Sequence, residues 1–225
     1  MESAGTPCPA PNPRAQRVGA RCTPRAALAR IFFVSVFPVY RAMLGLAILV
    51  ATSCTQAAVS EALSYTPYGV ADDPRAAVST VLERATPNRQ GGRVFLGYTH
   101  WEISWHLRWA EAAGGYCRLI QSQTTLRITI SLPRLYGATN QRSREFLKIL
   151  TGLRIHELGH ASIAEDAARA IDAALDTVPQ TPGCAALEAA ANLKAQRLLD
   201  EYGAKQVRYD AVTDHGRRQS AWSGE

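Results

Sequence analysis

The chain has 225 residues, of which 47% are hydrophobic and 20% are charged, which is ordinary for a globular protein with one good core. The formal net charge is +6, but residues 1–57 hold six arginines against one acidic residue, so the remainder is almost neutral. We therefore expect no nucleic-acid partner, because the folded part offers no strong charge excess to phosphate.

Residues 1–57 have the composition of a leader. The first 30 residues are rich in Pro, Ala and Arg without apolar periodicity, and two short apolar runs follow at 31–40 and 43–52. Neither run is long enough to span a bilayer, and small residues of the kind that a signal peptidase cleaves after come next. We predict cleavage after Ala57 or Ala58, and hence a secreted or periplasmic protein.

Three alternatives to this cleavage stay open. Cys54 could carry a lipid, although the residues before it match a lipoprotein signal poorly. The two apolar runs could together attach the protein to a membrane. Translation could also start at Met43, in which case the first 42 residues are never made.

The cysteines fall into two groups. Three of the five, at positions 8, 22 and 54, lie in the leader, and only Cys117 and Cys184 remain in the folded part. In an exported chain two remaining cysteines predict one disulfide, closing a loop of about 68 residues and contributing roughly 4 kcal/mol at most.

We expect the folded domain to cover residues 59–216, followed by a C-terminal tail at 217–225. A short strand is predicted at 64–70, and Asp72-Asp73-Pro74 is expected to open a helix that runs to about Ala85. The next two strands alternate with period two, over 93–109 and 118–132, with Gly114-Gly115 between them. This pattern predicts a long antiparallel hairpin with three tryptophans in its apolar face, as core rather than as a binding groove.

Two long helices are predicted after the hairpin. The first begins near residues 140–143 and runs to Asp176 or Thr177, and a proline-rich break follows at 178–183. The second runs from Cys184 to about Ala211. The expected fold class is α+β and zincin-like, with a small antiparallel sheet and its long hairpin packed on two antiparallel helices.

The first long helix carries the sequence His156-Glu157-Leu158-Gly159-His160. Residues four apart on a helix share one face, so both imidazoles can point at one metal ion while Glu157 sits beside them. Neutral imidazoles are good Zn²⁺ ligands, the ion lowers the pKa of a bound water, and the carboxylate accepts its proton. The pattern predicts His156 and His160 as zinc ligands and Glu157 as general base.

A catalytic zinc ion needs a third protein ligand. If the two helices are antiparallel neighbours, residues near Tyr202 should face His160, and those near Gln206 should face His156. The candidate ligands then lie just beyond, with His215 ranked first, Asp210 second and Asp214 third. Tyr209 is a candidate for stabilising the oxyanion of the reaction, although packing is the commoner role for such a tyrosine.

Several short motifs follow one another along residues 59–216. They are Thr99-x-Trp101-x-x-x-Trp105, Cys117, Leu132-Pro133, the His-Glu-Leu-Gly-His segment, Gly183-Cys184 with Leu187-Glu188, and Tyr209-Asp210-x-x-Thr213-x-His215-Gly216. In this combination the chain resembles a bacterial family described as predicted secreted zinc-dependent proteases, first catalogued as a domain of unknown function. The resemblance implies zinc ligation by His156 and His160, catalysis by Glu157, and a place in the site for the motif that ends at Gly216.

The expected function is that of an exported zinc metalloprotease in the bacterial cell envelope, acting on peptide or protein substrates. Two alternatives are kept. The protein could be a non-catalytic envelope protein with a structural zinc or a partner-binding role, or a zinc amidase that acts on the cell wall.

Overall fold

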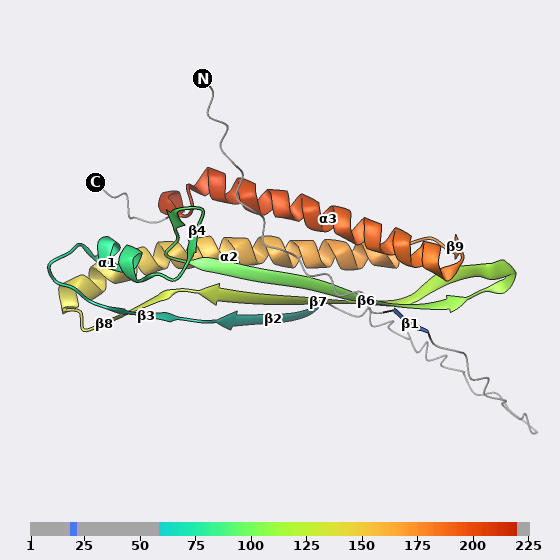
Figure 1. Cartoon of the computed structure of the whole chain (residues 1–225), viewed down its shortest axis with the longest axis horizontal. Helices are drawn as coiled ribbons and strands as arrows, with labels where there is room; N and C mark the ends of the chain where they lie inside the picture. The colour runs from blue at the N-terminus through green and yellow to red at the C-terminus, as the bar shows by residue number, and fades with distance from the viewer. Residues whose placement is uncertain (1–18, 22–58, 220–225) are drawn as a thin grey trace, which may run out of the picture.

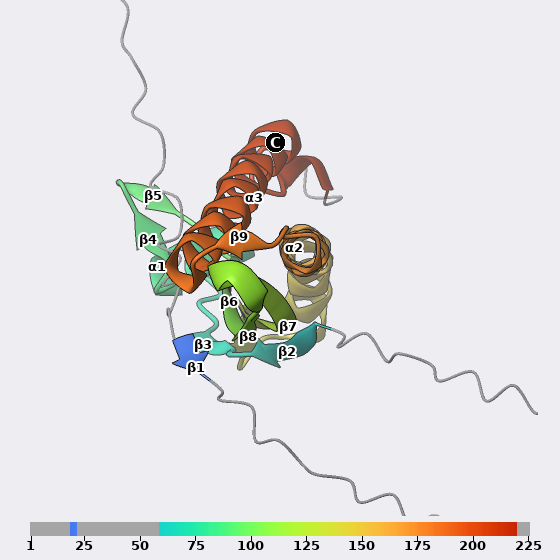
Figure 2. The same ribbon diagram turned by 90° about the vertical axis from the view of Figure 1, so that its right-hand side faces the viewer.

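Two long antiparallel helices lie on one face of a mixed sheet in the computed structural model, which describes residues 19–21 and 59–219 (Figures 1 and 2). The helices are α2 (Asn140–Asp176) and α3 (Cys184–Thr213), and a shorter helix, α1 (Val78–Ala85), lies at one end. The α+β class and the antiparallel helix pair are therefore confirmed. The predicted apolar runs and cleavage site of the leader lie outside the described residues.

The sheet is built around the predicted hairpin of β6 (Tyr98–Glu111) and β7 (Tyr116–Ser131), which are joined by a tight turn, η1 (Ala113–Gly115). Gly114 and Gly115 have φ near +78° and +77°, which glycine adopts without strain. The remaining strands of this sheet pair with the hairpin at its two edges: β1 (Gly19–Arg21) with β6, and β2 (Ser60–Tyr65) and β9 (Thr181–Pro182) with β7.

The sequence predicted an antiparallel sheet, but the sheet is mixed. β2 runs parallel to β7, with Ser60 opposite Thr125 and Tyr65 opposite Ile130. The chain between β2 and β6 stays at the end of the molecule that carries α1, so β2 and β6 run in opposite directions (Figure 1). Since β7 is antiparallel to β6, β2 is parallel to β7.

The strand predicted at 64–70 is two strands. Proline has no backbone N–H to donate to a ladder, and Pro67 separates β2 from β3 (Tyr68–Ala71). β3 pairs with β8 (Pro133–Tyr136), which follows β7 after Leu132. Each break in one strand therefore lies beside the break in its neighbour.

Helix α1 begins at Val78, several residues after the predicted start at Asp72. The Asp72 carboxylate instead accepts two hydrogen bonds of 2.7 Å from the Nε and Nη2 atoms of Arg142, near the start of α2. Hydrogen bonding to Arg142 lowers the pKa of Asp72. Asp72 therefore anchors the first turn of α2 through Arg142 and does not start a helix of its own.

The apolar face of the hairpin forms the main core with α2 and α3. Its tryptophans are buried, as predicted, with Trp101 at 6%, Trp105 at 6% and Trp109 at 9% exposure. Trp105 donates a 2.8 Å hydrogen bond from Nε1 to Asn192 of α3. On the opposite face of β6, His100 and His106 are exposed.

Helix α3 begins beyond the end of α2 and rises away from the sheet toward its own C-terminal end (Figure 1). The break between the helices explains the offset, because β9 pairs with the start of β7, near the tip of the hairpin, and carries the chain outward before α3 begins. The site described below lies where the distance between α3 and the sheet has grown.

Cys117 and Cys184 are joined in a disulfide, as predicted, with Cα atoms 5.0 Å apart. The bond ties the start of α3 to the start of β7 across 67 positions of sequence. We expect the paired substitution Cys117→Ala with Cys184→Ala to lower the free energy of unfolding by roughly 2–4 kcal/mol, measured by urea denaturation. Reducing the wild-type disulfide should lower it comparably, and an unchanged unfolding midpoint in both experiments would contradict this role.

In the part of the chain that the structure describes, none of the helices has the length and apolar character needed to cross a membrane.

Candidate metal centre

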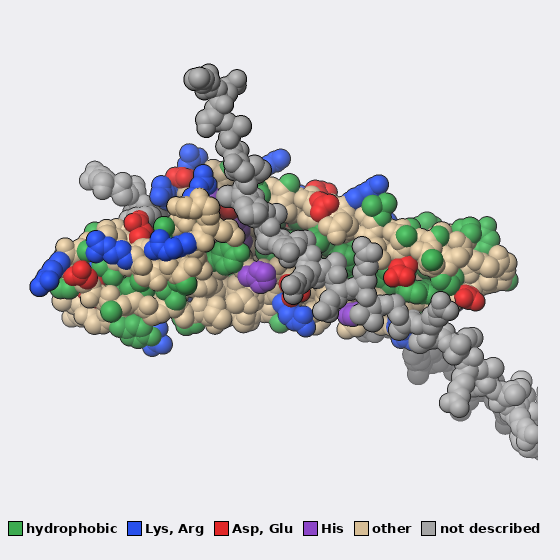
Figure 3. Space-filling view, in the orientation of Figure 1, with side chains coloured by type: hydrophobic (Ala, Val, Ile, Leu, Met, Phe, Trp, Pro, Cys, Tyr) green, Lys and Arg blue, Asp and Glu red, His purple; other side chains and the backbone are tan. Residues whose placement is uncertain are grey.

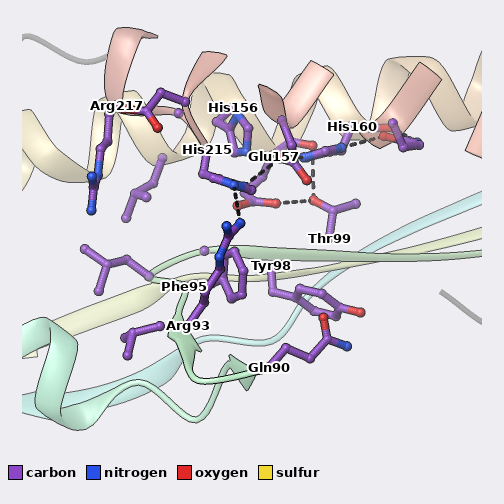
Figure 4. Close-up of a pocket in the computed structure, with 18 of the residues that line it drawn as sticks. Gln90, Arg93, Phe95, Tyr98, Thr99, His156, Glu157, His160, His215 and Arg217 are labelled. Atoms are coloured by element: carbon purple, nitrogen blue, oxygen red, sulfur yellow. Dashed lines mark hydrogen bonds and ion pairs between the residues drawn. The ribbon is translucent and has the colours of Figure 1, made fainter. Parts of the chain in front are cut away.

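The His-Glu-Leu-Gly-His segment lies in the middle of α2, with its three polar side chains turned toward α3 and the start of β6 (Figure 4). His156 and Glu157 are buried, at 4% and 3% exposure, and His160 is half-buried. Helical spacing brings the Nε2 atoms of His156 and His160 to 3.2 Å from each other. The predicted convergence of the two imidazoles is thus present.

Asp210, near the C-terminal end of α3, completes a triangle with these nitrogens. Its Oδ1 atom lies 3.0 Å from His160 Nε2 and 3.2 Å from His156 Nε2. Among the described residues, His156, His160 and Asp210 form the one group of potential ligands whose donor atoms all lie within 4.8 Å of one another. The second-ranked candidate from the sequence therefore occupies the position of a third ligand.

Two glutamines hold the other nitrogen of each ring. Gln206 Oε1 lies 2.5 Å from His160 Nδ1, and Gln206 Nε2 donates a 3.0 Å bond to the carbonyl of His160, which fixes the orientation of the amide. Gln219 Oε1 lies 2.9 Å from His156 Nδ1. Because a carbonyl oxygen can only accept, each Nδ1 carries a proton in the neutral ring, and each Nε2 presents a lone pair.

Three lone pairs consequently meet at the centre of the triangle. Such a cluster is stable only with a cation, either a proton or a metal ion, between the donors. Without metal, burial opposes protonation of His160, but hydrogen bonds to Asp210 and Gln206 outweigh it and raise the pKa of His160. Burial also disfavours the ionised form of Asp210, yet hydrogen bonds from His156 and His160 lower the pKa of this carboxyl strongly.

Glu157 lies beside the triangle in a closely fitted position. The Thr99 hydroxyl lies 2.6 Å from its Oε2 atom, and Gly97 packs against the carboxylate, so that a side chain at position 97 would collide with it. Burial raises the pKa of Glu157 even though Thr99 and the two histidines favour the ionised form. A buried carboxylate with a raised pKa, held by one hydroxyl, is suited to accept a proton.

Tyr209 packs behind the histidines. Its ring stacks on that of His156, with centroids 5.2 Å apart and planes 10° from parallel, and its hydroxyl accepts a 2.7 Å bond from Gln219 Nε2. The tyrosine passes over Gly159, where any side chain would overlap the phenol. This placement supports the packing role considered above, and the oxyanion role of Tyr209 remains a prediction.

The chain turns sharply after α3 and brings His215 to the rim of the centre. Asp214 and His215 adopt left-handed conformations with φ of 49° and 50°, and Gly216 follows at 84°. A Cβ atom at position 216 would lie 2.9 Å from the His156 ring, so only glycine permits this approach. The turn continues into η2 (Arg217–Gln219), so the first residues of the predicted tail belong to the folded site.

His215, ranked first as the third ligand, lies outside the triangle. Its Nδ1 atom is 3.5 Å from Asp210 Oδ1, and its Nε2 atom accepts a 3.3 Å bond from Arg93 Nη1. Figure 4 shows Arg93 reaching toward His215 from the strand across the cleft. Arginine cannot act as an acceptor, so the Nε2 atom of His215 is the acceptor in this contact. Asp214, ranked third, is exposed.

The centre opens into a cleft of about 660 Å³ between α2, α3 and the segment that leads into β6. His156, Glu157, His160 and Asp210 all line it. The opposite wall includes the hairpin of β4 (Arg89–Gln90) and β5 (Arg93–Val94). Lysine and arginine side chains gather over this end of the molecule (Figure 3).

The expected register of the two helices was wrong by about one turn. Gln206, expected opposite His156, faces His160, and Asp210 faces both histidines. Antiparallel helices that start at the same level would place Gln206 opposite His156, but the β9 segment moves the start of α3 outward. Gln219, Gly97 and Arg93 were not identified from sequence, since their roles depend on the chain folding back from outside both helices.

Fold and site together define an α+β protein with a candidate metal centre shared by two antiparallel helices. Residues 65–216 match the family described as "Bacterial protein of unknown function (DUF922)", and the chain belongs to this family. No match was found among curated proteins or among solved structures. Family membership agrees with the resemblance found in the sequence, and the proteolytic activity attached to that resemblance is taken up below.

Proposed function

We propose that this protein is a zincin-like metalloprotease that holds Zn²⁺ with His156, His160 and Asp210. The observation that carries the proposal is the triangle of three donor atoms beside a buried carboxylate, facing an open cleft. Donors placed 2.0–2.1 Å from a tetrahedral zinc ion lie about 3.3 Å from one another. The edges of this triangle, at 3.0, 3.2 and 3.2 Å, fit that ion closely.

The donor types support zinc as well. Two imidazoles and one carboxylate are a common catalytic zinc set, whereas magnesium and calcium prefer oxygen ligands alone. Zinc in such a set acts as a Lewis acid toward a carbonyl and lowers the pKa of a coordinated water to about 7.

The protein's own groups then have separate tasks. Glu157 accepts the proton of the attacking water and passes it to the leaving amine, while the Thr99 hydroxyl holds the carboxylate in place. Arg93, a permanent cation in the cleft wall, is suited to the negative charge that develops on the carbonyl oxygen. His215 positions the Arg93 guanidinium through the bond at its Nε2 atom.

The open cleft beside the three donor side chains favours a catalytic zinc site over a structural one. Structural zinc sites have four protein ligands and are closed, whereas catalytic sites keep one position free. Here the three donor side chains all line the cleft, and His215, the nearest candidate for a fourth ligand, is engaged with Arg93. This argues against the non-catalytic envelope protein considered above.

An extended peptide suits the edge of β6. Within the described ranges, β1 covers this edge only at residues 107–109, so the backbone from Tyr98 to His106 has no strand on that side. The free edge starts next to Glu157, because Thr99 contacts this carboxylate. A substrate strand can add to such an edge by backbone hydrogen bonds, which favours a peptide over the glycan-linked amides of the cell wall.

We further propose that the protein acts outside the cytoplasm, in the bacterial cell envelope or beyond it. The disulfide supports this location, because disulfides persist in oxidising compartments. Attachment to a membrane through the apolar runs of the leader remains an alternative to release.

Purified exported protein should contain one zinc ion per chain and cleave unfolded protein. Removal of zinc by a chelator should abolish cleavage, and stoichiometric zinc should restore it, followed by metal analysis and mass spectrometry of the fragments. Release of peptides from peptidoglycan without cleavage of protein substrates would favour the amidase alternative. Stoichiometric zinc with neither activity would favour a structural site.

The amide of Gln206 should matter for zinc affinity although it does not touch the ion. Replacing groups that orient metal ligands typically costs 10–100-fold in affinity. Gln206→Met keeps the length of the side chain but removes both contacts to His160, so we expect zinc affinity to fall by roughly 10–100-fold, measured by competition with a chelating dye. Gln196→Met, on the same helix and away from the cleft, should leave the affinity unchanged.

A further inference from the structure

Gly203 lies in the interior of α3, where glycine is the least favourable residue apart from proline. Its backbone is helical, since Gly203 is absent from the glycines with positive φ among the described residues, so conformation does not require glycine. Apart from its own helical turn, a Cβ atom placed on Gly203 would meet no atom of the described residues within 4 Å, so packing against this part of the protein does not require glycine either.

Gly159 of α2 provides the contrast. There an added Cβ atom would overlap the ring of Tyr209, so the glycine is explained by a contact inside the protein. Gly203 instead faces open space, and that space is the cleft, which it lines together with Gln206 and Val207. Neither backbone conformation nor a contact with the described residues accounts for this glycine, and a group that enters the cleft from outside would find the space free.

Two apolar residues line the cleft together with Gly203. Trp101, on the β6 side, and Val207, one helical turn further along α3, also line the cleft. Val207 is 48% exposed, which is high for a valine that faces a cleft, and α3 has moved away from the sheet in this region (Figure 1). A large apolar side chain placed beside Gly203 would cover the exposed surface of Val207, one turn away on the same face of the helix.

The distance from Gly203 to the candidate metal centre corresponds to a few residues of an extended peptide. Gly203 precedes Asp210 by seven residues, about 10.5 Å along the helix. An extended chain advances about 3.3 Å per residue, so this distance corresponds to roughly three residues. Trp101 likewise follows Thr99, the contact of Glu157, along β6.

We propose that Gly203 opens a specificity subsite for a large apolar or aromatic side chain, about three residues from the peptide bond that is cleaved. The inference rests on the proposed protease function and adds a substrate class to it: extended peptides with a bulky residue at that distance. Gly203 determines specificity and takes no part in the bond cleavage itself.

The test uses the zinc-loaded exported protein and quenched peptides in which a single Phe is moved through an alanine-rich sequence on both sides of the cleaved bond. Wild type should favour Phe at one position about three residues from that bond by at least about tenfold in kcat/KM. Gly203→Leu should remove this preference, so that the ratio of kcat/KM for the best Phe peptide to kcat/KM for the all-alanine peptide falls from at least about ten to about one. Ala204→Leu, the exposed neighbour outside the cleft, should behave as wild type.

A second measurement does not depend on activity. Gly203→Ala should raise Tm by roughly 2–4 °C, because alanine is the better helix former and meets no obstruction. A Gly203→Leu variant that loses all peptides equally, or keeps the Phe preference, would overturn the subsite while the protease function stands. If wild type cleaves no peptide, the proposed protease function fails. Binding of the Phe peptide can still be measured in that case by fluorescence anisotropy, and equal affinity for wild type and Gly203→Leu would overturn the subsite too.

Discussion

Glu157→Gln should abolish peptide hydrolysis while leaving one zinc ion bound per chain. The substitution keeps the size of the side chain and an oxygen that can accept from Thr99, so the closely fitted position beside Gly97 is preserved. The amide cannot accept a proton from water, and general base catalysis of this kind contributes typically 10²–10⁴-fold. We expect kcat to fall by at least about a thousandfold, measured with a quenched peptide.

Glu165→Gln is the matched control, since it changes a glutamate to a glutamine on the same helix. Glu165 lies two turns beyond the centre and is paired with Arg169 on the surface at 3.9 Å. Its variant should retain full activity. Hydrolysis by Glu157→Gln at the wild-type rate would remove Glu157 from the mechanism, whereas loss of zinc from this variant would reassign it as a support of the metal centre.

Asp210→Ala should lose zinc, whereas His215→Ala should keep it. Asp210 Oδ1 is the third corner of the triangle, and removing a ligand should reduce zinc affinity by more than the 10–100-fold typical of groups that only orient ligands. His215 contacts Arg93 at its Nε2 atom, so its removal should lower kcat and leave zinc content unchanged. Zinc stoichiometry and affinity, together with kcat, distinguish the two roles.

Asp214→Ala serves as the control for this pair, because it lies in the same turn but its side chain is exposed. It should retain both zinc and activity. If His215→Ala loses zinc and Asp210→Ala retains it, the ligand ranked first from the sequence is the correct one, and the His215 ring must turn inward when the ion binds. Loss of zinc from both variants would indicate four ligands and a structural site.

The elements with strong periodicity were predictable from sequence. The β6–β7 hairpin alternates over many residues around Gly114-Gly115, and the two long helices are separated by prolines, so short-range rules suffice to place them. The mixed character of the sheet was not predictable in this way. It depends on the path of the chain between β2 and β6, which periodicity does not encode.

The site residues likewise include some that the sequence could place and one that it could not. His156, Glu157 and His160 lie within one helical turn, so their convergence follows from helix geometry. The third donor of the triangle comes from another helix, whose register depends on where the β9 segment lets α3 begin. Asp210 could be placed among three candidates but not selected, because an offset of one turn exchanges the residues that face the histidines.

The order of the donors along the chain has a consequence for when the centre can form. Both imidazoles are made about fifty positions before Asp210, and Gln219, which steadies His156, comes later still. A polypeptide that emerges from a ribosome with its amino end first therefore presents an incomplete set of donor atoms until Asp210 has been made. The triangle of donors can therefore form only after α3 has been made as far as Asp210, and a chain that stops earlier carries both imidazoles without their third partner.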